Sequence, residues 1–153
     1  MAYEVTLERV AAEPMAAVAA QATQAQLSRV IPNALDAVYA ALRTGNYGKL
    51  GCNTVLYGPG ENGAMDLRIG VRLDRPFMGV GKVTGCETPA GEAVHVVYLG
   101  EYSKMHPAHQ AAQRAAVAMG RKLTGASWEV YGDFTSDVSK LRTDIFYGVE
   151  ADG

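Results

Sequence analysis

An internal repeat with an offset of 74 residues constrains the fold more than any other feature of the sequence. The segment TVLYG at 54–58 and the segment WEVYG at 128–132 share a tyrosine and a glycine at that offset. The same offset aligns one side of two helical segments and places Leu35 over His109. Because strand, helix and turn follow in the same order in both halves, we infer a duplication. The matched identities are Tyr57 with Tyr131, Gly58 with Gly132, Leu67 with Leu141 and Arg68 with Arg142.

The repeat predicts an α+β fold in which each half contains a strand, a helix and two further strands. The strand segments are rich in β-branched and aromatic residues or alternate apolar with polar residues. The first helical segment has apolar residues at helical spacing, and turns rich in glycine and proline separate the strands. The predicted strands are 3–10, 15–22, 52–58, 63–73, 79–89, 92–102, 127–134 and 141–149, and the predicted helices are 24–43 and 108–123.

Three local features refine these elements. The segment MAAVAAQA at 15–22 favours a helix by propensity, but the repeat equates its neighbourhood with the strand EAVHVVYL, so we predict a strand. Pro32 lies inside the first helical segment, so the regular helix is expected to begin near it. In the second half Ser103 is a candidate helix cap, and Pro107 lies near the first turn.

Length and composition predict one domain, residues 1–153, with repeat halves 3–77 and 78–150. The net charge is −2 and no cluster of lysine and arginine is present, so direct nucleic-acid binding is not expected. No apolar run approaches the roughly 20 residues of a membrane span, and no signal-peptide pattern opens the chain. We therefore expect a cytoplasmic protein. Cys52 and Cys86 lack a metal-binding spacing and are expected to be small core residues.

A carboxylate, Glu129, sits in the middle of a predicted strand of bulky residues. Strand alternation places Glu129 and Tyr131 on one face and Trp128 on the other, where packing beneath a helix is expected. The closing strand brings Tyr147 to the face of Glu129 if the hairpin pairs residues of equal parity, whereas a bulge exchanges it for Phe146. By residue pattern alone, a glutamate in mid-strand faces solvent more often than a pocket.

Several short elements in the second half occur in a characteristic order. They are a P-A-G turn at 89–91, a G-x-Y step at 100–102, an E-x-Y strand at 129–131 and a closing R-T-[DE]-I strand at 142–145. In this order and spacing the chain resembles the GyrI-like family, also called the bacterial transcription-activator effector-binding domain. The resemblance is clear over 78–150 and weaker over 3–77. Two features differ from the family pattern. GDFTSD stands where many relatives have an Asp-Pro dipeptide, and the sequence shows no helix-turn-helix pattern, so we do not expect direct gene control.

The resemblance implies two pseudo-symmetric βαββ modules whose strands form a curved antiparallel sheet, with both helices on its convex face. The distantly related SOUL proteins share this duplicated fold. A pocket for small organic molecules is implied on the concave face, and a strand glutamate reaches into it in characterised relatives. The matching residue here is Glu129. The candidate ligand-binding residues are Glu129, Tyr147, Tyr131, Tyr57, Trp128 and Tyr98.

The resemblance leaves three functions open. The first is a stand-alone domain that binds small hydrophobic, including cationic, molecules, because a carboxylate among tyrosine faces attracts organic cations. The second is a hydrolase of reactive toxins or other electrophiles, in which Glu129 and Tyr131 would act as acid or base and its partner. The third is a protein-interaction role such as topoisomerase modulation. Each tyrosine is also compatible with core or rim packing, and assembly as a homodimer or with another protein stays open.

The remaining residues indicate no metal or cofactor. His106 and His109 are three residues apart on a helix without a third ligand nearby in sequence, and His95 alternates with apolar neighbours as a core residue does. No axial-ligand pattern for heme is present. The glycine-rich segment 57–63 lacks the G-K-[ST] of a phosphate-binding loop and fits a hairpin turn better.

Overall fold

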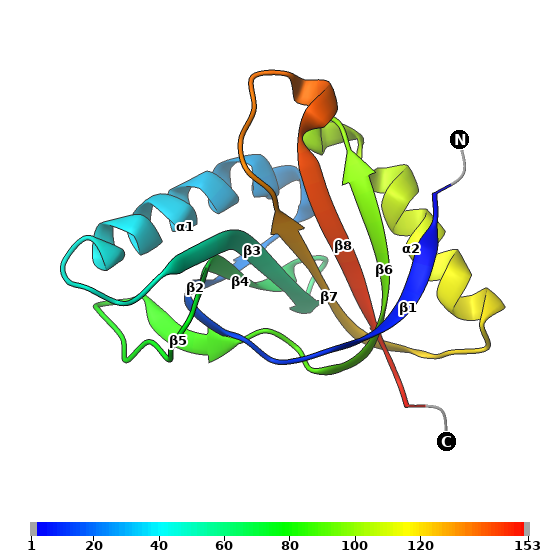
Figure 1. Cartoon of the computed structure of the whole chain (residues 1–153), viewed down its shortest axis with the longest axis horizontal. Helices are drawn as coiled ribbons and strands as arrows, with labels where there is room; N and C mark the ends of the chain where they lie inside the picture. Colours follow the sequence, from blue (N-terminus) through cyan, green and yellow to red (C-terminus); the bar gives the residue numbers. More distant parts are fainter. Residues whose placement is uncertain (1–2, 152–153) are drawn as a thin grey trace. The chain divides into compact units, whose positions relative to one another are not determined.

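The computed structural model describes residues 3–151, which form two compact units, each with four antiparallel strands and one long helix (Figure 1). Unit 1 consists of residues 3–11 and 89–151, and unit 2 of residues 12–88. The predicted α+β class and the duplication of strand, helix, strand and strand are confirmed.

Unit 1 contains the strand order β1, β6, β8, β7, with every neighbouring pair antiparallel. Its helix α2 lies along β6 and β8 and also contacts β1 (Figure 1). The short 3₁₀ turns η2 and η3 precede α2 and β8. The elements are β1 (Val5–Val10), β6 (Gly91–Leu99), η2 (Tyr102–Lys104), α2 (His106–Ala118), β7 (Leu123–Tyr131), η3 (Val138–Lys140) and β8 (Arg142–Val149).

Unit 2 repeats this arrangement with the strand order β5, β2, β4, β3, again antiparallel throughout. Its helix α1 packs on β2 and β4. The segment at 15–22 is a strand, as the repeat predicted against its alanine content. The elements are β2 (Pro14–Ala22), η1 (Gln24–Gln26), α1 (Leu27–Leu42), β3 (Leu50–Pro59), β4 (Met65–Leu73) and β5 (Thr84–Glu87).

The outer strands do not pair within the sequence half in which they lie. β1 precedes β2 in the chain but pairs with β6, where Val5 lies opposite Val96. β5 precedes β6 but pairs with β2, where Met15 lies opposite Cys86. The segments that flank the P-A-G-E turn therefore form no hairpin. The compact units therefore differ from the sequence halves 3–77 and 78–150. Each outer strand belongs to the unit that contains the strand with which it pairs, not to the half of the chain in which it occurs.

Two helix boundaries differ from the sequence expectation. α1 begins at Leu27 and runs through Pro32. Both Pro32 and Ser28 four residues earlier are exposed, so water can satisfy the carbonyl that the proline leaves without an amide partner. Ser103 lies in η2 and does not cap α2, which begins at His106. Pro107 occupies the first turn of α2, as expected.

The core of unit 1 lies between α2 and one face of its sheet. Three alanines at successive four-residue intervals, Ala108, Ala112 and Ala116, are fully buried against the strands. Small side chains let the helix approach the sheet closely, over strand residues that include Val96 and Ile145. Burying such a valine or isoleucine side chain stabilises the fold by about 1.5–3 kcal/mol. Glu129 lies on this same face of the sheet, because it sits opposite Ile145.

The strand registers show that the constant offset does not extend to the closing strands. Tyr57 lies opposite Leu67, whereas Tyr131 lies opposite Thr143. Leu67 therefore corresponds to Thr143 when the two tyrosines are aligned, and the identity with Leu141 is a coincidence. The loop between β7 and β8 is longer than the loop between β3 and β4, which accounts for the shift.

Two further sequence expectations can be compared with the described residues. Cys52 is exposed and Cys86 is half-buried, both as free thiols, so the prediction of a core position is wrong for Cys52. Among residues 3–151, no helix is both long and apolar enough to cross a membrane.

Candidate functional site

Strand β7 places Glu129 and Trp128 on opposite faces of the unit 1 sheet. Glu129 lies opposite Ile145 and Trp128 lies opposite Phe146, so residues of equal parity pair and Tyr147 shares the face of Glu129. The parity alternative that brings Phe146 to this face is thereby excluded. Glu129 is only 4% exposed, so the mid-strand carboxylate does not face solvent. Its face is the one that α2 covers, whereas the family resemblance implied a pocket on the face without helices.

A chain of hydrogen bonds extends from Glu129 in two directions. The Tyr131 hydroxyl donates to Glu129 Oε1 at 2.5 Å. On the other oxygen, Glu129 Oε2 lies 2.8 Å from His109 Nε2, and His109 Nδ1 lies 2.7 Å from the Tyr147 hydroxyl. A neutral imidazole satisfies all of these contacts when Nε2–H donates to Glu129 and Nδ1 accepts the Tyr147 proton. We refer to Glu129, His109, Tyr131 and Tyr147 as the carboxylate cluster.

The net charge of the carboxylate cluster depends on Glu129 and His109, because Tyr147 stays neutral. Burial and, secondarily, the charge of Glu129 raise the pKa of Tyr147 to about 12, so its hydroxyl keeps its proton at neutral pH. With Glu129 ionised and His109 neutral, the cluster carries one net negative charge. The two ring contacts of His109, to Glu129 and to Tyr147, hold the imidazole in one orientation.

The cluster is not sealed from its surroundings. The side chain of His109 keeps 21% of its exposure, while that of Glu129 keeps 5%. Next to it, the ring of Tyr102 meets the ring of Tyr131 edge to face at 5.5 Å between centroids, and Tyr102 is 44% exposed. Aromatic surface therefore extends from the buried carboxylate toward solvent. This arrangement combines a desolvated negative charge with nearby π faces.

His109 is the member of the cluster that the sequence interpretation missed as a site residue. The repeat carried a signal, because His109 occupies the helix position equivalent to Leu35, on the side expected to face the sheet. A titratable ring at a core-facing helix position requires a polar partner on the strand beneath it. The sequence pattern suggests His109 only as a possible metal ligand together with His106, which is exposed in the structure.

Two further predicted site residues, Tyr98 and Tyr57, are not members of the carboxylate cluster as defined above. Tyr98 is 5% exposed, packs in the core beside α2, and donates its hydroxyl to the Glu101 carbonyl at 2.8 Å. This placement favours a packing role for Tyr98. Tyr57 lies on β3 in unit 2, and its part in ligand binding stays a prediction.

Trp128 does not pack beneath a helix, contrary to expectation. It is 4% exposed and stacks on Phe146 with ring centroids 5.2 Å apart and planes inclined by 6°. Phe146 in turn stacks on His95 at 4.3 Å. These three rings come from β7, β8 and β6, on the sheet face opposite the carboxylate cluster. Trp128 is therefore buried in an aromatic stack on the face of the sheet away from α2.

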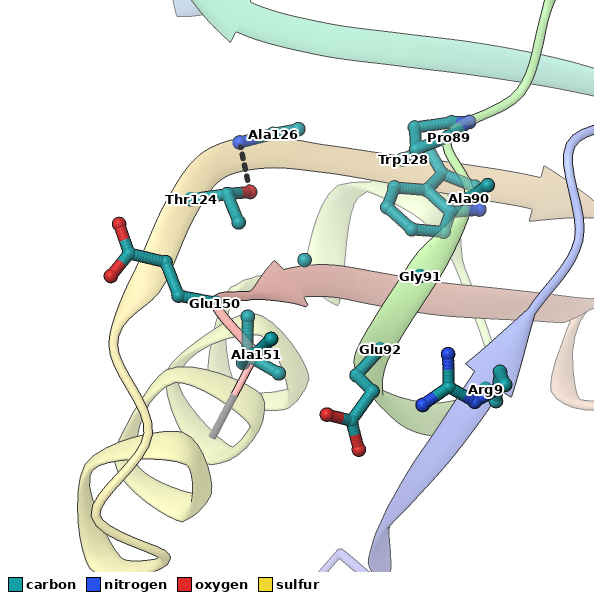
Figure 2. A pocket seen from close by; sticks show the side chains of 12 residues that line it. Arg9, Pro89, Ala90, Gly91, Glu92, Thr124, Ala126, Trp128, Glu150 and Ala151 are labelled. Carbon is teal, nitrogen blue, oxygen red and sulfur yellow. Dashed lines mark hydrogen bonds between the residues drawn. The ribbon is translucent and has the colours of Figure 1, made fainter. Parts of the chain in front are cut away.

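A pocket of about 300 Å³ lies beside Trp128, on the face away from Glu129. Figure 2 shows the Trp128 indole next to Pro89, with Glu92 and Arg9 near each other and Glu150 at another part of the lining. Residues with small side chains, including Gly91 and Gly148, form much of its wall. The charges at its mouth are mixed, and the Arg121 side chain binds Glu92 at 2.5 Å.

Comparison with known proteins shows the fold. No family model and no curated protein matches the chain. The C-terminal domain of EcmrR superposes with a TM-score of 0.81 at 20% identity, covering 98% of this chain and 99% of that domain. The chain spans 57% of the longer EcmrR chain seen in a complex with DNA.

Two further solved structures have the same fold. SAV2435 bound to tetraphenylphosphonium superposes with a TM-score of 0.68 at 17% identity, covering 97% of this chain and 94% of that one. A hydrolase from Listeria innocua superposes with a TM-score of 0.62 at 11% identity, covering 97% and 93%. The chain therefore has the GyrI-like fold that its sequence resemblance predicted.

Proposed function

We propose that this protein binds small hydrophobic organic cations at the carboxylate cluster, with Glu129 as the charge anchor. The observation that carries the proposal is the near-complete burial of Glu129 among Tyr131, His109 and Tyr147. A carboxylate that has lost most of its contact with water attracts a cation more strongly than a solvated one. Tyrosine faces add about 0.5–2 kcal/mol for each ring that a cation contacts.

The choice of a cation is supported by two arguments. The cluster carries one net negative charge when His109 is neutral. Tyr147 adds no charge, because its pKa is raised to about 12 and the hydroxyl stays protonated. A protein with the same fold, SAV2435, is known in complex with tetraphenylphosphonium, a hydrophobic cation. Because a delocalised cation needs no directional hydrogen bond, attraction to Glu129 and contact with aromatic rings are together sufficient for recognition.

The size of the effect follows from Coulomb's law. At about 6 Å between the carboxylate and the centre of a bulky cation, and an effective dielectric of about 20, the attraction is roughly 2.8 kcal/mol. Removing the charge in Glu129→Gln should therefore weaken cation binding by about a hundredfold, or nearer tenfold where water screens the pair.

Isothermal titration calorimetry with tetraphenylphosphonium at about pH 8 tests this proposal. Neutral triphenylphosphine oxide serves as the ligand control, and Glu150→Gln serves as the matched variant because Glu150 lines the pocket beside Trp128. We expect the cation to bind the wild type and Glu150→Gln equally and Glu129→Gln at least tenfold more weakly. Equal binding to wild type and Glu129→Gln, or a loss confined to Glu150→Gln, would contradict the proposal.

A second function, hydrolysis of a reactive electrophile, is favoured by one specific observation. Tyr147, His109 and Glu129 form a continuous hydrogen-bonded series, the arrangement in which a carboxylate orients an imidazole and the imidazole exchanges protons with a hydroxyl. A protein with this fold from Listeria innocua is described as a hydrolase. In such a reaction Glu129 or His109 would take a proton from water while Tyr147 donates one to the departing group.

Product formation from a panel of epoxides and activated esters separates the two functions. Turnover by the wild type that is lost in both Glu129→Gln and His109→Gln, with ligand affinity kept in at least one of them, would establish catalysis. Binding of a cation without any turnover across the panel would leave the ligand-binding function alone.

A further inference from the structure

The residue that contacts the charge anchor can itself carry a positive charge. His109 Nε2 lies 2.8 Å from Glu129 Oε2, on the same carboxylate that a bound cation would have to approach. The other ring nitrogen, Nδ1, lies 2.7 Å from the Tyr147 hydroxyl, which can either donate to it or accept from it. The hydrogen-bond partners of the ring therefore accommodate both the neutral and the protonated imidazole without movement.

We propose that His109 determines which ligands the carboxylate cluster accepts. With a neutral imidazole the cluster carries one net negative charge and takes organic cations. With a protonated imidazole the positive ring neutralises Glu129, and the cluster rejects cations while still accepting neutral aromatic molecules. This inference rests on the proposed cation-binding function.

Within unit 1, the strands beside α2 present the following titratable groups to His109 or to its partner Glu129. β7 presents Glu129 with its bound Tyr131, and β8 presents Tyr147, whose pKa of about 12 keeps it neutral throughout the working range. β6 presents Tyr98, which is bonded to a backbone carbonyl. The acidic side chain of β1, Glu8, points to the opposite face of the sheet and contacts His95 there.

The proposal has a quantitative consequence for the pH dependence of binding. Histidine is the side chain whose charge ordinarily changes between pH 5 and pH 8. If a cation binds only when the imidazole is neutral, each bound cation excludes one proton, and the apparent Kd rises up to about tenfold for each pH unit below the transition. Neutral ligands should show no comparable change, because they gain nothing from the net charge.

The experiment measures the Kd of tetraphenylphosphonium between about pH 8 and about pH 5.5 for three proteins. His109→Gln keeps an amide that can donate to Glu129 but cannot titrate. His106→Gln is the matched control, because it removes an exposed imidazole from the same helix. We expect wild type and His106→Gln to lose at least tenfold in affinity over this range and His109→Gln to lose less than twofold.

Other outcomes overturn the proposal in distinguishable ways. Wild-type binding that is strong at about pH 8 and equally strong at about pH 5.5 refutes the role of His109 while leaving cation binding intact. A loss that persists in His109→Gln assigns the pH dependence to another group and also refutes it. No binding at about pH 8 means that the proposed function itself has failed.

A measurement on the wild type alone guards against a variant that does not fold. Calorimetry in two buffers with different ionisation enthalpies gives the number of protons released when the cation binds. We expect a release that approaches one proton as the pH is lowered through the transition. No release at any pH between about 5.5 and about 8 would overturn the proposal.

Discussion

Replacing Asp144 with asparagine should destabilise the strand that carries Tyr147. Asp144 lies on β8 on the face opposite the carboxylate cluster, with 19% of its side chain exposed. Its Oδ1 lies 2.7 Å from His95 Nε2, and Arg142 donates to the carboxylate at 3.0 and 3.1 Å. His95 Nδ1 in turn lies 2.6 Å from Glu8 of β1, so these side chains connect three adjacent strands.

The expected magnitude follows from how exposed each partner is. Arg142 is 55% exposed, so its ion pair is worth only about 0.2–1 kcal/mol. The contact with His95, 16% exposed, is better protected, and a hydrogen bond to a charged group contributes about 1.5–3 kcal/mol. Because asparagine keeps one accepting oxygen, we expect Asp144→Asn to lower the free energy of unfolding by about 2 kcal/mol at neutral pH.

The loss should depend on pH in a defined direction. Burial alone would raise the pKa of Asp144, but the hydrogen bonds and charges of Arg142 and His95 outweigh it and lower that pKa. A lowered folded-state pKa means that the carboxylate stabilises the fold above its unfolded pKa of about 3.9, and this contribution disappears as the pH falls through the folded value. The difference between wild type and Asp144→Asn should therefore be full at neutral pH and vanish in strong acid.

Urea denaturation of wild type, Asp144→Asn and the exposed-site control Asp36→Asn at pH values from about 7 to about 2.5 measures this difference. We expect Asp36→Asn to stay within about 0.5 kcal/mol of wild type. A gap for Asp144→Asn that is absent at neutral pH, or that persists undiminished in strong acid, would refute the assignment of these contacts.

Two further substitutions test the packing of the two units, with Gly70 in unit 2 and Trp128 in unit 1. In Gly70→Ala the new Cβ would lie 1.8 Å from the Ala16 carbonyl oxygen, so β2 and β4 must separate. We expect urea denaturation to show a free energy of unfolding lower by at least about 3 kcal/mol, and a decrease below about 1 kcal/mol would contradict the close approach of the two strands. Trp128→Ala removes a buried ring stacked on Phe146, so we expect the free energy of unfolding to fall by about 3–5 kcal/mol. The affinity of the folded fraction for tetraphenylphosphonium should change by less than threefold, because the ring lies on the face away from Glu129.

Much of the fold was predictable because it depends on local patterns that the duplication reinforces. Alternation in β7 placed Glu129 and Tyr131 on one face, and the structure has them there. The sequence left open whether Tyr147 or Phe146 joins them, and the register of β7 with β8 decides for Tyr147. The repeat also identified 15–22 as a strand against its helix propensity, because a neighbouring half supplied evidence that the segment itself lacked.

The rest depends on contacts between segments distant in sequence. The pairing of β1 with β6 joins residues that lie more than eighty positions apart, such as Thr6 and His95, and no local pattern specifies it. The contact between His109 and Glu129 depends on how α2 is rotated over the sheet. Trp128 stacks on Phe146 and, through it, on His95 across three strands, and alternation alone does not distinguish such a stack from packing beneath a helix.

The most direct test of the central claim locates the cation in a crystal of the complex. Tetraphenylarsonium has the same shape and charge as tetraphenylphosphonium, and anomalous scattering identifies its arsenic atom without ambiguity. The account predicts an arsenic peak within about 6 Å of the Glu129 carboxylate, the range over which a cation interacts with surrounding aromatic rings. A peak beside Trp128 instead would contradict it.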